Sequence, residues 1–206
     1  MSAVKERPIL FSAPMVRAIL EGRKTVTRRE VKKQAALDCL ASGFEPAFLA
    51  LPGNADLCPY GLPGDRLWVR ETWAQPANLD PGPTVYRATY PDCIKDQGWE
   101  NLPPSSAIRW KPSIHMFRRD SRILLEITEV SVERLQDISR SDIRAEGLEC
   151  PPELASDDVS PNYRDWYPAA WRELWESING AGAWDANPWV WVVEFKRVRP
   201  YADQVG

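Results

Sequence analysis

The chain has 206 residues and a formal net charge of −3, a size that suits one domain with a sizeable core. The acidic balance argues against a general nucleic-acid coat protein, which would be strongly basic. No stretch resembles a membrane span or a secretion signal, so we expect a cytoplasmic protein without a membrane partner. Its four cysteines are scattered and it has one histidine, His115, so we expect reduced thiols, no metal and no cofactor.

The N-terminal part of the chain predicts a strand, a short helix and a charged strand. The apolar run over residues 8–11 is typical of a strand. Residues 14–21 predict a helix, because Ser12 suits its N-cap and Gly22 suits the left-handed position that ends helices. The dense charge that follows predicts an extended segment with two faces, formed by Lys24, Val26 and Arg28 and by Thr25, Thr27 and Arg29.

Two long segments outside the regular pattern are predicted as insertions, at about residues 31–60 and 74–107. The first includes a predicted helix over 35–40, and the second includes a short strand around 85–88. Between the insertions, a Pro-Gly-Asp turn signal precedes a predicted strand over 66–73. Connections of such length in a compact domain are usually functional lids or disordered segments.

The C-terminal half predicts a strand over 122–132, helices over 139–146 and 169–178, and a strand over 188–198. The first helix begins with an approximate capping box, and a Pro- and Asp-rich loop at 149–163 separates the two helices. The last strand is apolar on both faces at its start, which predicts a central position. Strands outnumber helices and do not alternate with them regularly. We therefore predict one α+β domain, a mixed β-barrel with peripheral helices rather than a doubly wound sheet.

The run from Ile19 to Arg29 resembles the signature of ASCH domains, which belong to the PUA-like superfamily. That signature is Gly-x-Lys, then Glu or Thr three residues after the Lys, then Arg two further on. It is met here by Gly22, Lys24, Thr27 and Arg29. Four later segments are similar to further parts of the family pattern, in the right order: 61–69, 109–122 (typical of the longer, phage-associated branch), 135–147 and 189–195. The resemblance implies a PUA-like mixed β-barrel.

The small ASCH proteins include amidohydrolases that remove the acyl group from N4-acylated cytidine. The resemblance implies that Lys24, Thr27 and Glu146 act together in such a reaction. Amide hydrolysis needs a nucleophile, a group that takes its proton, and a donor for the leaving nitrogen. Thr27 either attacks or positions a water, and Lys24 acts as a neutral base or as a charged oxyanion stabiliser. A protonated Glu146 would pass its proton to the cytosine nitrogen.

Each of these three residues also has a purely structural interpretation. Glu146 would be a residue at a helix end, Thr27 an ordinary strand former and Lys24 a surface charge. Core packing is the better interpretation for the tryptophans at core spacing, which are Trp171, Trp175, Trp189 and Trp191. The candidate substrate-binding residues flank the expected cleft and are Arg28, Arg29, Trp68, Arg70, Glu71, Trp73, Trp110, Ser113 and His115.

The main alternative is a non-catalytic RNA-binding module, with ribonuclease as a second enzymatic option. A module that binds RNA predicts salt-sensitive affinity that weakens when Arg28 and Arg29 are neutralised, with no product formed. A phage-encoded interaction module without chemistry is a third interpretation. Whether the substrate is a free nucleoside or RNA stays open, as does the preferred acyl group.

Overall fold

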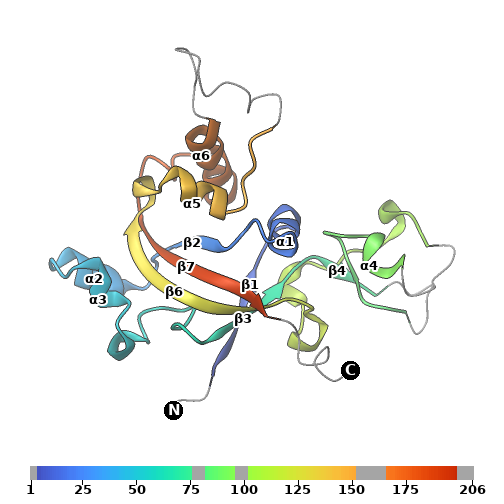
Figure 1. Ribbon diagram of the computed structural model, residues 1–206, viewed down its shortest axis with the longest axis horizontal. Coiled ribbons are helices and arrows are strands. Elements are labelled where there is room, and N and C mark those ends of the chain that lie inside the picture. The colour runs from blue at the N-terminus through green and yellow to red at the C-terminus, as the bar shows by residue number, and fades with distance from the viewer. Residues whose placement is uncertain (1–3, 76–81, 96–101, 152–165, 199–206) are drawn as a thin grey trace. The chain divides into compact units, whose positions relative to one another are not determined.

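The computed structural model describes residues 4–75, 82–95, 102–151 and 166–198, which form an α+β fold (Figure 1). Five strands make one mixed sheet in the order β1-β3-β6-β7-β2. Their bounds are β1 Glu6–Leu10, β2 Val26–Glu30, β3 Arg66–Arg70, β6 Leu124–Arg134 and β7 Trp189–Val198. β1 and β3 pair in parallel, whereas β3 with β6 and β2 with β7 pair antiparallel. The sheet confirms the mixed α+β class, and β1 and β2 stand at the two ends of its order.

The described residues divide into two compact units. The first unit takes its residues from 1–21, 65–126 and 197–206, and the second from 22–64 and 127–196. The predicted α+β domain therefore consists of two units, each of which has elements from distant parts of the chain. Strand β6 begins in the first unit and continues into the second.

The first unit contains β1, β3, the start of β6 and helix α1 (Ala13–Leu20). Beyond β3, the short strands β4 (Trp73–Ala74) and β5 (Val85–Tyr86) form a separate two-stranded sheet. This small sheet packs with helix α4 (Asp92–Lys95) around a cluster of Ala74, Val85, Ile94 and Ile108. Three 3-10 turns follow, at Ser105–Ala107, Ser113–His115 and Arg118–Asp120.

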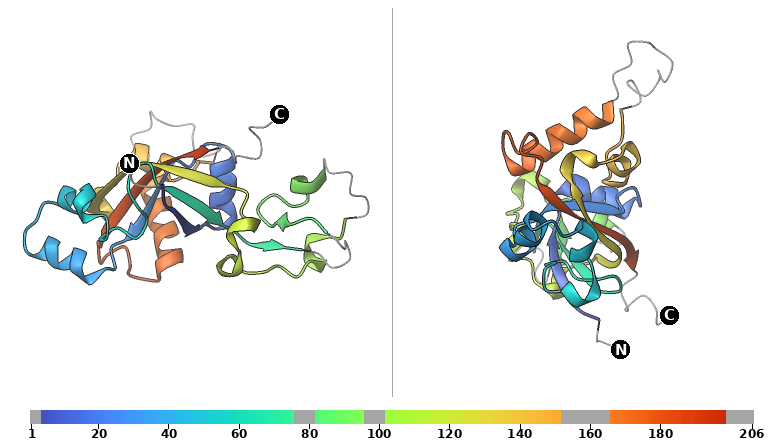
Figure 2. Two further views of the ribbon diagram at one scale, coloured as in Figure 1. Left: turned by 90° about the horizontal axis from the view of Figure 1, so that it is seen from below. Right: turned by 90° about the vertical axis from the view of Figure 1, so that its left-hand side faces the viewer.

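The second unit contains β2, β7 and most of β6, with two groups of helices. Helices α2 (Gln34–Ala41) and α3 (Pro46–Leu49), with a 3-10 turn at Pro52–Asn54, occupy the first insertion. Helices α5 (Arg140–Ala145) and α6 (Trp166–Asn179) lie together beside β2 and β7, as Figures 1 and 2 show. A 3-10 turn at Leu135–Asp137 precedes α5. The core between these helices and strands contains Val26, Leu135, Ile143, Tyr167, Trp171, Trp175, Val190 and Val192.

Most predicted elements are confirmed, and the differences have local causes. The predicted strand over 66–73 ends at Arg70, because Trp73 and Ala74 pair with β5 in the separate sheet. The first insertion contains the helix predicted over 35–40, which spans Gln34–Ala41, and it also contains a second short helix and a 3-10 turn. Residues 76–81 and 96–101 of the second insertion, and 152–165 of the predicted acidic loop, lie outside the described residues.

The helix ends follow the predicted chemistry. Gly22 has φ +77°, the left-handed conformation expected at the end of α1. Ser12 occupies the N-cap position of that helix, although its side chain accepts no capping hydrogen bond. At α5 the predicted cap is complete on one side, because the Ser139 hydroxyl accepts a hydrogen bond from the Asp142 backbone N–H at 3.1 Å. In the described part of the chain, no helix has the length and apolarity to cross a bilayer.

Candidate functional site

A backbone connection places Lys24 beside the end of α5. The Thr25 N–H donates to the Ala145 carbonyl at 2.8 Å, and Lys24 and Glu146 form an isolated antiparallel bridge. On its other side, Thr25 accepts a hydrogen bond from the Phe195 N–H at 2.9 Å. The segment before β2 is therefore held between α5 and β7. A carboxylate 122 residues further along the chain thereby reaches Lys24.

The Lys24 ammonium is fully buried and donates to three oxygens. Nζ lies 2.8 Å from the Val26 carbonyl, 3.0 Å from the Glu146 carbonyl and 2.5 Å from Glu146 Oε2. The side chains of Lys24 and Glu146 are 0% and 3% exposed. An ammonium has three N–H donors, so this arrangement suits the charged form of lysine. The carboxylate contact is a charge-assisted hydrogen bond, and it puts Nζ and Oε2 within reach for a proton transfer.

Burial works against that charged form. It lowers the pKa of Lys24 below its ordinary value, the carboxylate of Glu146 opposes this effect, and the cations of Arg29 and Arg28 add to it. A proton transfer to Glu146 would convert two buried charges into a neutral amine and a neutral acid, which removes the desolvation penalty of both. The pair is thus suited to exchange a proton internally.

Arg28, predicted as a substrate-binding residue, is occupied by protein carboxylates. Its Nε donates to Glu133 Oε1 at 2.7 Å, its Nη2 lies 3.3 Å from Asp142 Oδ2, and its Nη1 lies 3.5 Å from Glu146 Oε1. The Arg28 side chain is 1% exposed. Its place in the structure is therefore inside an ion-pair network rather than at a surface open to ligand.

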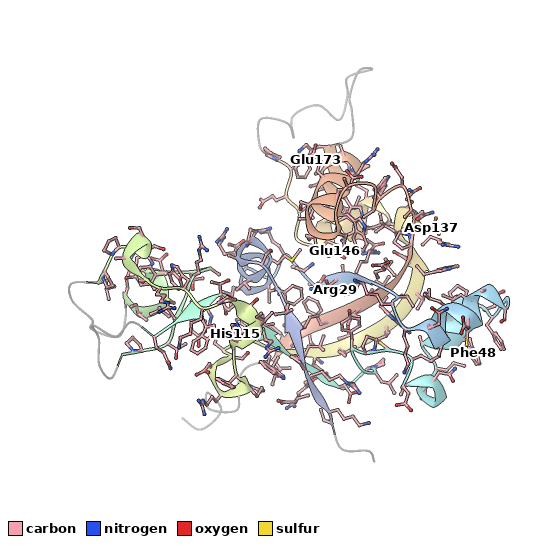
Figure 3. All side chains as sticks on the ribbon, turned by 180° about the vertical axis from the view of Figure 1, so that it is seen from behind. Arg29, Phe48, His115, Asp137, Glu146 and Glu173 are labelled. Carbon is pink, nitrogen blue, oxygen red and sulfur yellow. The ribbon has the colours of Figure 1, made fainter. Side chains whose placement is uncertain are left out.

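Thr27 and Arg29 lie on the other face of β2. They stand opposite Val193 and Trp191 of β7, whereas Arg28 stands opposite Val192 in the core below α5 and α6. Thr27 is buried. Burial lowers the pKa of Arg29, whereas the charges of Tyr60 and Glu146 raise it. Figure 3 labels Arg29 and Glu146, which lie near each other in the second unit.

Tyr60 is a residue that the motif did not identify. It comes from the first insertion, and burial raises the pKa of its hydroxyl while the Arg29 cation lowers it. The only signal in the sequence was an aromatic hydroxyl at the end of an insertion that was expected to cover the site. Tyr60 joins Lys24, Thr27, Arg29 and Glu146 as a member of the second unit.

The remaining predicted binding residues belong to the first unit. Arg70 donates from Nε to the Met116 carbonyl at 3.1 Å, and its guanidinium lies 5.1 Å from the ring centre of Trp68. Buried Glu71 accepts two hydrogen bonds from Arg122, at 2.9 and 3.0 Å. Burial raises the pKa of Glu71, and Arg122 opposes the shift. Arg70 and Glu71 thus have structural partners within their own unit.

The three tryptophans proposed for base stacking differ in exposure. Trp73 is 3% exposed, with the Lys111 ammonium 4.4 Å from its ring centre, so its ring is already covered. Trp110 is half-buried edge-on to Tyr90, and its indole N–H donates to the Ser105 carbonyl at 3.0 Å. Trp68 is also half-buried. Ser113 and exposed His115 lie in a 3-10 turn, and the binding roles of these residues stay predictions.

The core assignments of the other tryptophans are mostly confirmed. Trp171, Trp175 and Trp191 are buried, whereas Trp189 is half-buried with the Arg134 guanidinium 4.1 Å from its ring centre.

Among the described residues, no group of three or more His, Cys, Asp or Glu side chains is placed to hold a metal ion. Comparisons of the chain with family models, with curated proteins and with solved structures found no match. The likeness to ASCH domains therefore depends on the quoted sequence motifs alone.

Proposed function

We propose that this protein is a metal-free amidohydrolase with a PUA-like fold, which removes the acyl group from N4-acylated cytidine and releases cytidine and a carboxylic acid. The substrate class comes from the ASCH resemblance. The observation that carries the proposal is the buried contact of 2.5 Å between Lys24 Nζ and Glu146 Oε2, at the two positions that the motif predicts for proton transfer.

The pair would supply both proton transfers of the reaction. First, the proton in the short contact moves from Lys24 Nζ to Glu146 Oε2, which leaves an amine and a carboxylic acid. The amine then takes a proton from the attacking hydroxyl, whose oxygen bonds to the acyl carbon. As the carbon–nitrogen bond breaks, Glu146 gives its proton to N4 of the leaving cytidine. Each full cycle returns the ionised pair.

The attacking hydroxyl belongs either to Thr27 or to a water that Thr27 positions. With Thr27 as nucleophile, an acyl ester forms on its oxygen, and water then cleaves that ester with the same two proton transfers. Arg29 shares the face of Thr27 on β2 and would place positive charge near the developing oxyanion. Its charge would favour the transition state over the neutral amide.

The direct test is hydrolysis of N4-acetylcytidine and N4-benzoylcytidine, followed by chromatography and mass spectrometry. Lys24→Met and Glu146→Gln should lower kcat by roughly 10²–10⁴-fold, the usual contribution of general acid–base groups. Lys32→Met and Glu149→Gln are matched controls, because both side chains are exposed near the site residues in sequence, and they should keep full turnover. Full turnover by the Lys24 or Glu146 variant would remove the site assignment.

Thr27 variants separate the two forms of attack. Thr27→Ser keeps a hydroxyl and should retain turnover in either case, whereas Thr27→Val should abolish it if Thr27 attacks. Mass spectrometry of enzyme quenched during turnover would then show an added acyl group on wild type. Circular dichroism must show that each variant is folded. Salt-sensitive binding of RNA by folded wild type, without any product, would favour the RNA-binding alternative instead.

A further inference from the structure

We propose that Arg28 is a positioning residue rather than a residue that contacts substrate. Its ion pairs with α5 hold the carboxylate of Glu146 against Lys24. Its kinetic consequences rest on the proposed function. Its structural consequences rest on the ion-pair geometry alone, so the two can be tested separately.

Helix geometry explains why Arg28 can form ion pairs with two residues of α5. Asp142 lies in the first turn of α5 and Glu146 is its C-cap residue, so the two carboxylates are four residues apart and project from the same face. The Arg28 fork spans both, with Nη2 3.3 Å from Asp142 and Nη1 3.5 Å from Glu146. Its third nitrogen, Nε, holds Glu133 of β6 at 2.7 Å. One guanidinium therefore joins β2, β6 and both ends of α5.

In these contacts each oxygen of the Glu146 carboxylate faces a different cation. Oε1 faces Arg28, and Oε2 faces Lys24 Nζ at 2.5 Å. A turn of the carboxylate plane away from this position would lengthen both contacts, so Arg28 and Lys24 together hold its orientation. Acid–base catalysis depends on such placement, because a proton transfers only within hydrogen-bond reach.

Arg28 and Thr27 point to opposite faces of β2. Arg28 points to the face covered by α5 and α6, and its opposite residue Val192 is part of the core cluster there. Thr27 and Arg29 point to the other face. A substrate that reaches the Thr27 hydroxyl would meet Arg29 before it met Arg28.

Arg28 also acts on Lys24 through charge. Among the charged groups that act on the Lys24 ammonium, Glu146 raises its pKa, whereas the Arg29 and Arg28 cations lower it. Removal of the Arg28 cation should therefore raise this pKa. A lysine made hard to deprotonate should work as a base only at higher pH, so the acid limb of the pH–rate profile should move upward.

The kinetic test compares Arg28→Lys and Arg28→Gln with Arg144→Gln. Arg144 is an exposed arginine of α5 that contacts the Tyr167 ring, so it controls for loss of a helix cation. We expect Arg28→Gln to lower kcat on the order of 100-fold with KM unchanged, as for a misplaced catalytic group. Arg28→Lys should have a higher kcat than Arg28→Gln, because lysine keeps the positive charge but lacks the three nitrogens of the guanidinium. A raised KM with wild-type kcat would assign Arg28 to substrate binding and overturn the inference.

The second test needs no substrate. Nuclear magnetic resonance of ¹⁵N-labelled lysine side chains would follow the titration of Lys24 Nζ, identified by its absence from Lys24→Met. The pKa of Lys24 should be higher in Arg28→Gln than in wild type and unchanged in Arg144→Gln. If Arg28→Gln fails to fold, Glu133→Gln takes its place, because it weakens the contact with Arg28 Nε without altering the charge of Arg28. This variant should still lower kcat with KM unchanged.

The outcomes separate the two proposals. Wild type that hydrolyses no acylcytidine but shows the Lys24 shift in Arg28→Gln would overturn the proposed function and support the role of Arg28. Active wild type with no change of kcat or of the Lys24 titration in the Arg28 variants would do the reverse.

Discussion

Removal of one partner of the Lys24–Glu146 contact should strongly destabilise the second unit around β2. Lys24→Met keeps a side chain of similar length but removes the ammonium. It leaves a carboxylate that is 3% exposed near the cations of Arg28 and Arg29, and it also removes the donor to two buried carbonyls. Breaking one side of a buried ion pair costs about 3–5 kcal/mol in the free energy of unfolding. For a chain of this size, the melting temperature should fall by about 6–20 °C.

The double variant Lys24→Met/Glu146→Leu distinguishes a lost pair from a damaged core. Arg28 would keep Glu133 and Asp142 as partners, so its buried guanidinium stays paired. The double variant should therefore be less destabilised than the sum of the single variants, with a coupling of about 0.5–3 kcal/mol for residues in direct contact.

The neighbouring pair Arg23 and Glu149 supplies a matched control cycle. Its atoms are 3.4 Å apart and its side chains are 37% and 71% exposed, so its coupling should be about 0–1 kcal/mol after solvent screening. Urea unfolding at pH 7, followed by circular dichroism, measures both cycles. If the losses at Lys24 and Glu146 simply add, as they should for the exposed pair, the two groups do not interact as the geometry requires.

Three further predictions concern single groups. Because the pKa of Lys24 is lowered in the folded protein, the unfolded chain binds more protons between that pKa and about 10.4. The free energy of unfolding of wild type, relative to that of Lys24→Met, should therefore rise with pH in this range, by at most about 1.4 kcal/mol per pH unit. Urea titrations at several pH values measure this slope. Gly22→Ala should cost about 1–2 kcal/mol in the same assay, and Gly22→Asn less, because φ is +77° and an added Cβ would meet nothing within 4 Å. Burial raises the pKa of Tyr86 to about 12, so absorbance at 295 nm should show a late-titrating tyrosine that Tyr86→Phe removes.

Features that depend on a few neighbouring residues could be predicted from the sequence. The left-handed Gly22 and the cap of α5 at Ser139 are examples, because each conformation is set within one turn of helix. The central position of β7 was also readable, since apolar residues on both faces need cover on both sides. The end of β3 at Arg70 was not, because it depends on the pairing of Trp73 with β5.

The partners of Arg28 show where such prediction stops. Glu133 is 105 residues away along the chain, and no periodic pattern relates two positions at that separation. The face of Arg28 was nevertheless predictable. Alternation along β2 already placed it opposite to Thr27 and Arg29, which argues against one ligand for both arginines. The predicted set of binding residues grouped Arg28 with Arg29 by charge, whereas alternation along β2 separates the two side chains.

Stability alone does not explain a buried network of this kind. Apolar side chains of similar volume often stabilise a core as well as a buried ion pair does, because they avoid the desolvation of two charges. The double variant therefore also tests function. If it keeps most of its stability but loses hydrolysis, Lys24 and Glu146 have a catalytic role and Arg28 positions them. If it keeps both stability and hydrolysis, Lys24 and Glu146 have no catalytic role, and Thr27 and Arg29 on the other face of β2 become the candidates.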